Sequence, residues 1–243
     1  MYLDNLKERY ARQIILPQIG EEGQRRLRNA SVLIVGMGGL GCPVALYLAG
    51  AGVGRIGLCD ADTVSLSNLQ RQTLYDSDMI GLRKSEAAGD RLRALNPDVV
   101  CEPIAERFTD GNADTLVKRY DLVIDCSDNF TTRFLIDDVC RRHGRPWIFG
   151  SIGEFNGYVS TFLPGNRGLG ALFPDREELE SRPAASGGVL GAVPGIIGAV
   201  EAAEALKVLC GIGNPLSGRV LVIDALAMTF ETCLLYTSPS PRD

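Results

Sequence analysis

The sequence is short of the features that mark several common enzyme classes. It contains a single histidine, His143, in a charged segment that we expect at the end of a helix. The sequence therefore gives no support for a Ser-His-Asp or Cys-His catalytic site that uses this histidine. No GxxxxGKS or GxxxxGKT motif occurs, which argues against a P-loop phosphotransferase. The seven cysteines form no CxxC pair, which is typical of a reduced, cytoplasmic protein.

Long apolar runs and a strong net charge are also missing. The longest uncharged segment, residues 29–54, is interrupted by glycines and by Pro43, so a strand, a turn and a helix explain it better than a membrane span. Charged residues near the N-terminus occupy positions where a secretory signal needs an apolar stretch. The formal net charge of -5 argues against binding duplex nucleic acid or an anionic membrane mainly by charge. We expect a cytoplasmic protein with no nucleic-acid or membrane partner.

The composition is that of an ordinary globular protein. Of its 243 residues, 45% are hydrophobic and 23% are charged, which excludes a collagen-like, coiled-coil or wholly disordered chain. A chain of this length buries roughly 70% of its unfolded surface, so neither disulfides nor metals are needed for stability.

From residue 31 onward, short apolar segments alternate with helical ones. This alternation predicts a Rossmann-like α/β fold, with a mostly parallel sheet covered by helices on both faces. Two charged segments before it, residues 6–13 and 21–28, are predicted to be helical. After residue 151 we expect a mixed-sheet lobe with a polar-alternating strand, an apolar helix at 195–209 and a further strand at 219–224. The predicted parallel strands are residues 31–35, 55–60, 99–104, 121–126 and 146–151.

These changes of pattern divide the chain into four parts. We expect an N-terminal helical segment at residues 1–30, a Rossmann-like nucleotide-binding core at 31–150, and a C-terminal lobe at 151–233 that is continuous with the core. The last ten residues, 234–243, are rich in Ser and Pro and cannot pack a core. We interpret them as a tail foreign to the fold.

A glycine-rich motif follows the first predicted strand and opens a helix. Its glycines let the backbone approach a phosphate at the helix N-terminus, where free N–H groups and the helix dipole favour anions. Asp60 ends the next strand, where an acidic side chain accepts hydrogen bonds from ribose hydroxyls. The motif predicts an adenine nucleotide without saying which one, and tight helix-on-strand packing with no ligand is the alternative. Its glycines are Gly36, Gly38, Gly39 and Gly41.

The segment at residues 60–72 favours ATP over a dinucleotide. It is too polar for a buried helix. Arg71 and Lys84 place two cations near the carboxyl ends of the strands, which suits a triphosphate better than a nicotinamide that stacks on an apolar surface. The alternative is that both are solvated surface charges.

A second acidic segment follows the fourth predicted strand. Asp128 lies beside the crevice where open α/β sheets bind ligands. We interpret it as a Mg²⁺ ligand, because a hard cation is usually held by one or two carboxylates together with phosphate oxygens. A helix N-cap is the competing role for Asp128 or its neighbour Asn129.

Together these motifs resemble the ThiF/MoeB/HesA family, adenylyltransferases that are related to ubiquitin-activating enzymes and act on small sulfur-carrier proteins. The similarity covers residue 9 to about residue 230. The most specific elements are SNLQRQ at 67–72 and DCSDN at 125–129, whereas the glycine motif alone would not identify the family. Other matching segments are RYARQIILPQIG, VLIVGMGGLG, GLRKSEAA, LNPDV, GVLGAVPGIIG and EAAEALKVL.

The resemblance implies an enzyme that uses ATP and Mg²⁺ to convert the C-terminal Gly-Gly end of a ubiquitin-like sulfur carrier into an acyl-adenylate, with release of pyrophosphate. It also implies a homodimer with composite sites, in which Arg12 reaches the active site of the neighbouring subunit; a salt-bridged surface arginine is the alternative. The catalytic residues that it implies are Arg12, Arg71, Lys84 and the Mg²⁺ ligand Asp128. The implied nucleotide contacts are Gly39, Asp60, Ser67, Asn68, Leu69, Gln70, Arg71, Lys84, Asp128 and Asn129.

Two features depart from the family pattern. Relatives commonly bind a structural zinc through two CxxC pairs, but here Gly168 and Ala171 replace the first pair and the second is missing. Without thiolates a Cys₄ site cannot form, so we predict a zinc-free protein. Many relatives also have an acyl-accepting cysteine before GVLG, where this chain has Ala184. We interpret the remaining cysteines as core residues.

Three functions follow from these observations. The first is the adenylyltransferase. A non-catalytic scaffold that binds nucleotide or carrier is suggested by the missing cysteines, and an NAD-dependent oxidoreductase ranks last. No short motif identifies the carrier protein or its pathway.

Overall fold

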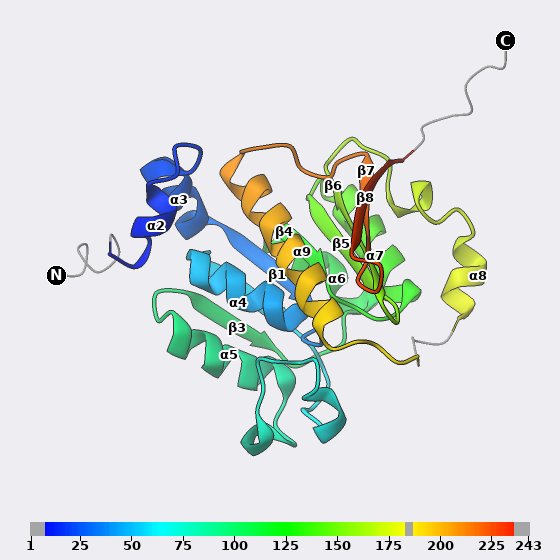
Figure 1. The fold of residues 1–243 in the computed structure, drawn as a ribbon, viewed down its shortest axis with the longest axis horizontal. Coiled ribbons are helices and arrows are strands. Elements are labelled where there is room, and N and C mark those ends of the chain that lie inside the picture. Colours follow the sequence, from blue (N-terminus) through cyan, green and yellow to red (C-terminus); the bar gives the residue numbers. More distant parts are fainter. Residues whose placement is uncertain (1–7, 183–186, 236–243) are drawn as a thin grey trace, which may run out of the picture.

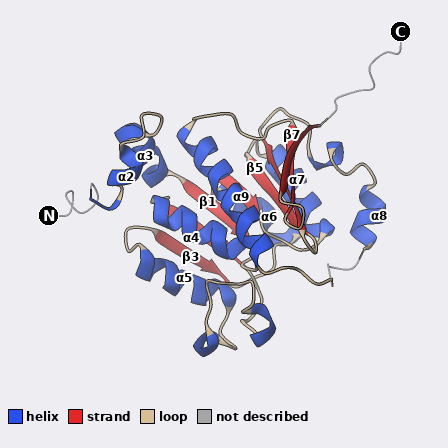
Figure 2. Ribbon diagram, in the orientation of Figure 1, coloured by secondary structure: helices blue, strands red, loops and turns tan. Residues whose placement is uncertain are grey.

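The computed structural model describes residues 8–182 and 187–235, which form an eight-stranded sheet with helices on both faces (Figures 1 and 2). The strand order is β3-β2-β1-β4-β5-β6-β7-β8. The first five strands of this order pair in parallel, and β6, β7 and β8 are antiparallel. The predicted α/β architecture is therefore confirmed.

The strands are short and the helices between them span one to five turns. The strands are β1 (Ser31–Val35), β2 (Arg55–Cys59), β3 (Val100–Ile104), β4 (Leu122–Asp125), β5 (Trp147–Ile152), β6 (Asn156–Phe162), β7 (Arg219–Asp224) and β8 (Thr229–Leu234). The α-helices are α2 (Ala11–Ile14), α3 (Gly20–Asn29), α4 (Gly41–Ala51), α5 (Lys84–Leu95), α6 (Asp110–Lys118), α7 (Phe130–Arg142), α8 (Arg176–Ser181) and α9 (Ala192–Cys210). The described residues also form three single turns of 3₁₀-helix: η1 (Leu66–Asn68), η2 (Ser77–Met79) and η3 (Leu169–Ala171).

Two hydrophobic cores lie on opposite faces of the sheet because successive strand residues point to opposite sides. In β1, Val32 and Ile34 belong to the core under α4, α5 and α9. Leu33 and Val35 belong to the core under α6 and α7. Both faces of β1 are buried, which explains why its sequence is apolar at every position.

The C-terminal part shares the sheet and the core of the first part. Strand β6 pairs with β5, and α9 packs on α4 as well as on β5 and β6. The apolar helix extends beyond the predicted 195–209 at both ends. Strand β8 was not predicted, and it includes Leu234, which the sequence pattern assigned to the tail. Residues 236–243 lie outside the described residues.

The N-terminal helices lie at the amino end of β1. Helix α3 leads directly into β1 through Ala30 and packs on α9. Figure 1 shows α2 and α3 on the side of the sheet from which β1 starts, opposite the loop that follows it. None of the described helices is long and apolar enough to cross a membrane.

Candidate active site

The parallel strands β1, β2 and β4 end side by side, so the loops that follow them lie together at one edge of the sheet. Val35, the last residue of β1, pairs with Cys59 of β2 and with Asp125 of β4. Helix α4 after β1 and helix α7 after β4 cover opposite faces of the sheet. The chain therefore diverges between β1 and β4, which is where open α/β sheets form a ligand-binding crevice.

The glycine loop crosses this edge and requires glycine at two positions. Gly36 has a φ of +97°, and a Cβ there would lie 2.5 Å from the carbonyl oxygen of Cys126 on the neighbouring strand end. A Cβ on Gly41 would lie 2.1 Å from the carbonyl oxygen of Gly36. The backbone N–H groups of Gly38, Gly39 and Leu40 donate no hydrogen bond to the described residues. Unpaired donors at the start of a helix are suited to binding an anion.

Asp60 and Tyr75 hold the glycine loop from its two sides. The Met37 N–H donates to one Asp60 oxygen and the Asp62 N–H to the other, both at 2.7 Å. Each oxygen of a carboxylate has a second lone pair, so Asp60 can still accept from a ribose hydroxyl. The buried Tyr75 hydroxyl lies 2.9 Å from the Met37 carbonyl oxygen and 3.3 Å from that of Lys84. The sequence patterns did not reveal this role of Tyr75.

The SNLQRQ segment lies against the glycine loop. A Cβ on Gly39 would be 3.7 Å from Cδ of Arg71 and 3.1 Å from Pro194 at the start of α9. The Arg71 guanidinium donates to the Ser67 carbonyl oxygen at 3.2 Å. The structure thus brings Arg71 beside the unpaired donors of the loop. Of the other predicted contacts, Ser67 and Gln70 are exposed and Asn68 and Leu69 are half-buried.

Lys84 is a buried cation at the first position of α5. Its side chain is 7% exposed, and Nζ lies 3.3 Å from the Asp62 carboxylate. The Lys84 N–H donates to the Asp62 carbonyl oxygen at 2.9 Å, which fixes the start of the helix. Asp62 is 58% exposed, so this ion pair opens to solvent and an incoming phosphate can compete for the ammonium group.

Asp128 and Asn129 have different roles at the start of α7. The Asn129 side chain accepts a hydrogen bond from the Thr132 N–H at 2.9 Å, so Asn129 is the N-cap of α7. The N-cap alternative therefore holds for Asn129. The exposed Asp128 carboxylate accepts a hydrogen bond from the Asn129 amide at 3.3 Å. One exposed carboxylate fits Mg²⁺ when phosphates supply the other oxygens, as is usual for this ion.

A buried ion pair supports the turn that carries Asp128. The Asp125 carboxylate ends β4, accepts hydrogen bonds from the N–H and hydroxyl of Ser127, and lies 3.6 Å from Nε of Arg133. Burial raises the pKa of Asp125 to about 6, although Arg133 opposes the rise. Arg133 also donates to the Ser127 carbonyl oxygen at 3.0 Å. The sequence did not reveal this buried pair, because a charged residue in a predicted helix, such as Arg133, is normally expected to face solvent.

Glu201 of α9 is a second buried carboxyl group at this edge. The side chain is fully buried, and neither oxygen has a hydrogen-bond partner among the described residues. A Cβ on Gly150 of β5 would lie 2.2 Å from its Oε1, so only glycine leaves room for it. Burial raises the pKa of Glu201 well above its ordinary value, with Asp125 adding to the rise and Arg133 opposing it.

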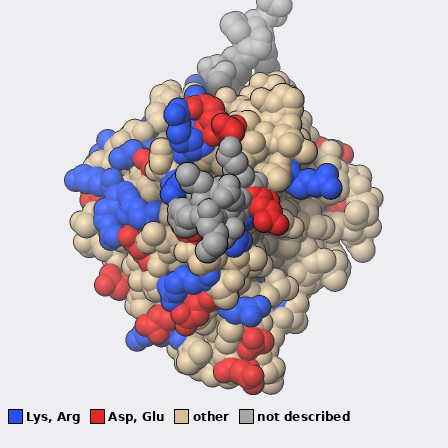
Figure 3. Space-filling view, turned by 90° about the vertical axis from the view of Figure 1, so that its left-hand side faces the viewer, with Lys and Arg blue, Asp and Glu red and all other residues tan. Residues whose placement is uncertain are grey.

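Arg12 does not join the other predicted catalytic residues within this chain. It is exposed on α2 and makes no hydrogen bond or ion pair with the described residues. Helix α2 lies at the amino end of β1, and the five residues of β1 separate the two ends by about 17 Å. Figure 3 shows this face, where positive and negative side chains are interspersed.

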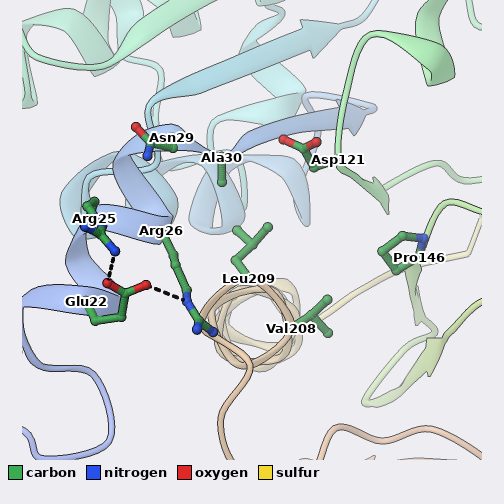
Figure 4. Close-up of a pocket in the computed structure, with 9 residues that line it drawn as sticks. All are labelled: Glu22, Arg25, Arg26, Asn29, Ala30, Asp121, Pro146, Val208 and Leu209. Atoms are coloured by element: carbon green, nitrogen blue, oxygen red, sulfur yellow. Dashed lines mark hydrogen bonds and ion pairs between the residues drawn. The ribbon is translucent and has the colours of Figure 1, made fainter.

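A surface cavity of about 700 Å³ lies at the wrong edge of the sheet for the predicted nucleotide site. Ala30, Asp121 and Pro146 line it, and each precedes a parallel strand. Figure 4 shows that Glu22 pairs with both Arg25 and Arg26 at one side of this cavity. The two arginines in the lining are balanced by the carboxylates of Glu22 and Asp121, so the cavity has no net positive charge to attract a phosphate.

Most of the cysteines are buried, and Gly168, one of the positions where relatives have a zinc ligand, lies against an acidic side chain. Six of the seven cysteines are buried, and burial raises the pKa of the Cys42 thiol to about 12, which makes it a poor nucleophile. A Cβ on Gly168 would lie 2.2 Å from an Asp137 carboxylate oxygen. The described residues contain no group of three or more His, Cys, Asp or Glu that could hold a metal ion. Ala184 lies outside the described residues.

Known proteins resemble this chain in sequence and in fold. The ThiF family pattern matches residues 10–242. The chain is 47% identical to the sulfur carrier protein adenylyltransferase of Thermus thermophilus, covering 96% of this chain and 88% of that protein. It is 45% identical to the SAMP-activating enzyme E1 of Haloferax volcanii, covering 96% and 86%. The crystal structure of E. coli MccB with succinimide superimposes with a TM-score of 0.84 at 25% identity, covering 95% of this chain and 72% of that one.

The family match spans nearly the whole described chain, and both curated relatives are similar over most of their own length. The chain belongs to the ThiF family, and it is an adenylyltransferase.

Proposed function

We propose that this enzyme activates the C-terminal glycine carboxylate of a small ubiquitin-like sulfur-carrier protein, with ATP as the AMP donor. The observation that carries the proposal is the convergence of unpaired loop N–H groups, Arg71, Lys84 and Asp128 at one edge of the sheet. N–H groups and two cationic side chains can bind the phosphates of a triphosphate, and the exposed carboxylate can bind the divalent cation that accompanies it. Two relatives are named as a sulfur carrier protein adenylyltransferase and a SAMP-activating enzyme, and this supports a carrier protein as the acceptor of AMP.

The reaction is an attack of the carrier carboxylate on the α-phosphorus of ATP. A bond forms between a carboxylate oxygen and the α-phosphorus, the bond to the bridging oxygen breaks, and pyrophosphate leaves with that electron pair. The nucleophile is ionised at pH 7, so no general base is required. The work of the protein is positioning and charge neutralisation on the α-phosphoryl oxygens and on the leaving pyrophosphate.

Each residue has a stated part in this proposal. The glycine loop and Asp60 hold the nucleotide, and Arg71 and Lys84 neutralise the phosphate chain. Asp128 would hold Mg²⁺, which supplies positive charge to the phosphate oxygens when bound. The buried pair of Asp125 and Arg133 acts only by fixing the turn before Asp128.

We also propose that the enzyme is a homodimer in which Arg12 completes the site of the partner subunit. The position of Arg12 at the opposite edge, without a partner among the described residues, supports a role outside its own subunit. Mixing Arg12→Ala and Asp128→Ala proteins tests this idea, because a heterodimer then contains one site with both residues intact. Recovery of exchange activity that neither variant shows alone is expected. No recovery after subunit exchange would contradict the composite site.

Two further expectations accompany the proposal. We expect the protein to function without zinc, because Gly168 and Ala171 stand where relatives have thiolates. We also place the enzyme in the cytoplasm, in keeping with its unpaired cysteines.

Carrier-dependent exchange of labelled pyrophosphate into ATP tests the function. The wild type is expected to catalyse exchange only with a carrier that ends in Gly-Gly. Arg71→Ala and Asp128→Ala are expected to lose at least about a hundredfold in exchange rate, whereas Arg28→Ala, at an exposed position of α3, serves as the folded control. Nucleotide binding without exchange would favour the scaffold, and hydride transfer would favour an oxidoreductase. Full exchange in both site variants would refute this site.

A further inference from the structure

Gln72 is a buried polar side chain that the assignment above leaves without a role. It is 4% exposed, and its Oε1 is buried with no hydrogen-bond partner among the described residues. Its Nε2 makes no hydrogen bond to them either, and it is not among their fully buried unpaired atoms, so a ligand can reach it. Buried amides are normally satisfied, so an unsatisfied one in a native fold calls for a specific explanation.

Gln24 shows what a structural glutamine does in the same chain. It is buried to a similar degree, at 9% exposed. Its Nε2 donates to the Ala51 carbonyl oxygen at 3.0 Å, and its Oε1 accepts from the Gln13 amide at 2.6 Å. Both ends of that amide are used in linking α2 and α3 to the end of α4. Gln72 makes no equivalent links, so packing and internal hydrogen bonding do not account for it.

The amide of Gln72 faces the glycine loop. A Cβ on Gly38 would lie 3.6 Å from Nε2 of Gln72, which is ordinary contact distance. The backbone around Gln72 is fixed: its N–H donates to the Asn68 carbonyl oxygen at 2.9 Å, and its carbonyl oxygen accepts from the Tyr75 N–H at 3.2 Å. With the backbone fixed in this way, the Gln72 amide lies beside Gly38, one of the loop residues with an unpaired N–H.

The part of Gln72 that suits an anionic oxygen ligand is the donor Nε2, which adds to a row of unpaired N–H donors, whereas Oε1 is an acceptor and is not paired by such a ligand. The loop offers donors at the start of α4, where the helix dipole also favours negative charge. Arg71, the residue before Gln72, lies against Gly39 of the same loop. We propose that the side-chain amide of Gln72 is a phosphate ligand of the nucleotide held at the glycine loop.

This inference rests on the proposed function, because it takes the glycine loop as the phosphate site. It is tested by comparing the dissociation constants of ATP and adenosine by calorimetry. Removing the amide in Gln72→Leu is expected to raise the dissociation constant for ATP about tenfold, as for a lost hydrogen bond to a charged group. The constant for adenosine, which has no phosphate, is expected to stay within about twofold of wild type.

Two companion variants separate ligand binding from folding. Gln72→Glu keeps the size of the side chain but turns a carboxylate toward the phosphates, so the loss for ATP is expected to exceed that of Gln72→Leu. Gln24→Leu is the matched control: it is expected to lower the thermal midpoint, because it breaks two internal hydrogen bonds, and to leave the ATP constant unchanged. If Gln72→Leu does not fold, Gln72→Glu is judged by the same criteria.

The outcomes distinguish the two proposals. Unchanged ATP binding in the Gln72 variants, or equal losses for ATP and adenosine, would overturn the role of Gln72 while leaving the proposed function in place. Failure of the wild type itself to bind ATP and to catalyse exchange would overturn the proposed function and the role of Gln72 with it.

Discussion

Replacing Glu201 by glutamine is expected to make the stability of the protein less dependent on pH. Glu201 is fully buried without a hydrogen-bond partner among the described residues, and burial raises its pKa well above the ordinary value of 4.5. In the unfolded chain the group loses its proton near that ordinary value. Above pH 4.5 the folded state therefore binds more protons than the unfolded state, and the free energy of unfolding falls as pH rises.

The magnitude follows from this difference in proton binding. One proton held only by the folded state lowers the free energy of unfolding by about 1.4 kcal/mol per pH unit. The slope continues until the pH passes the folded pKa of Glu201. Asp125, whose pKa burial raises to about 6, contributes in the same direction at lower pH. It is present in both proteins, so its contribution cancels in the difference between them.

Urea unfolding of wild type and Glu201→Gln at a series of pH values between 5 and 8 measures this difference. Near pH 5 the two proteins are expected to be of similar stability, since both carry a neutral group at position 201. As the pH rises, the unfolding free energy of the variant is expected to exceed that of wild type by about 1.4 kcal/mol more for each pH unit. Glu231→Gln, on exposed β8, is the control and is expected to show no pH-dependent difference. A flat difference for Glu201→Gln, or wild type gaining on the variant as pH rises, would refute the reasoning.

Three further predictions test other parts of the structure. Tyr75→Phe removes the hydroxyl that lies beside the Met37 and Lys84 carbonyl oxygens and is expected to cost about 1 kcal/mol of unfolding free energy and to weaken ATP binding; wild-type values in urea unfolding and calorimetry would contradict this. Asn129→Ala removes the N-cap of α7 and is expected to cost about 1 kcal/mol, whereas Asn129→Asp keeps an acceptor and is expected to cost much less; equal losses would argue against the cap. Metal analysis of the purified protein is expected to find no stoichiometric zinc and its thermal midpoint is expected to be unaffected by a chelator, so one zinc per chain would overturn the zinc-free assignment.

The sheet and the convergence of the main site residues could be predicted because both follow from regular patterns. Apolar strands that alternate with helices require a parallel sheet, and the carboxyl ends of parallel strands share one edge. Residues placed just after strands, such as Gly36, Asp60 and Asp128, therefore had to lie near one another.

The residues that were missed depend on features that have no short sequence pattern. Tyr75 and Gln72 lie in the long connection between β2 and α5, whose path is set by individual hydrogen bonds rather than by periodicity. Glu201 belongs to α9, which packs on α3, α4 and the sheet. A charged residue in such a helix does not show which side of the helix faces solvent. Strand β8 is exposed at every residue, which removes the burial alternation by which a strand is recognised.

The source of an oxygen atom in the released AMP tests the central claim most directly. A carrier whose C-terminal carboxylate contains heavy oxygen is incubated with the enzyme, ATP and Mg²⁺, and the acyl-adenylate is then cleaved at its acyl carbon with hydroxylamine. Attack of the carboxylate on the α-phosphorus predicts one heavy oxygen atom in AMP, detected by mass spectrometry. Release of AMP without the label would contradict the reaction assigned to this site.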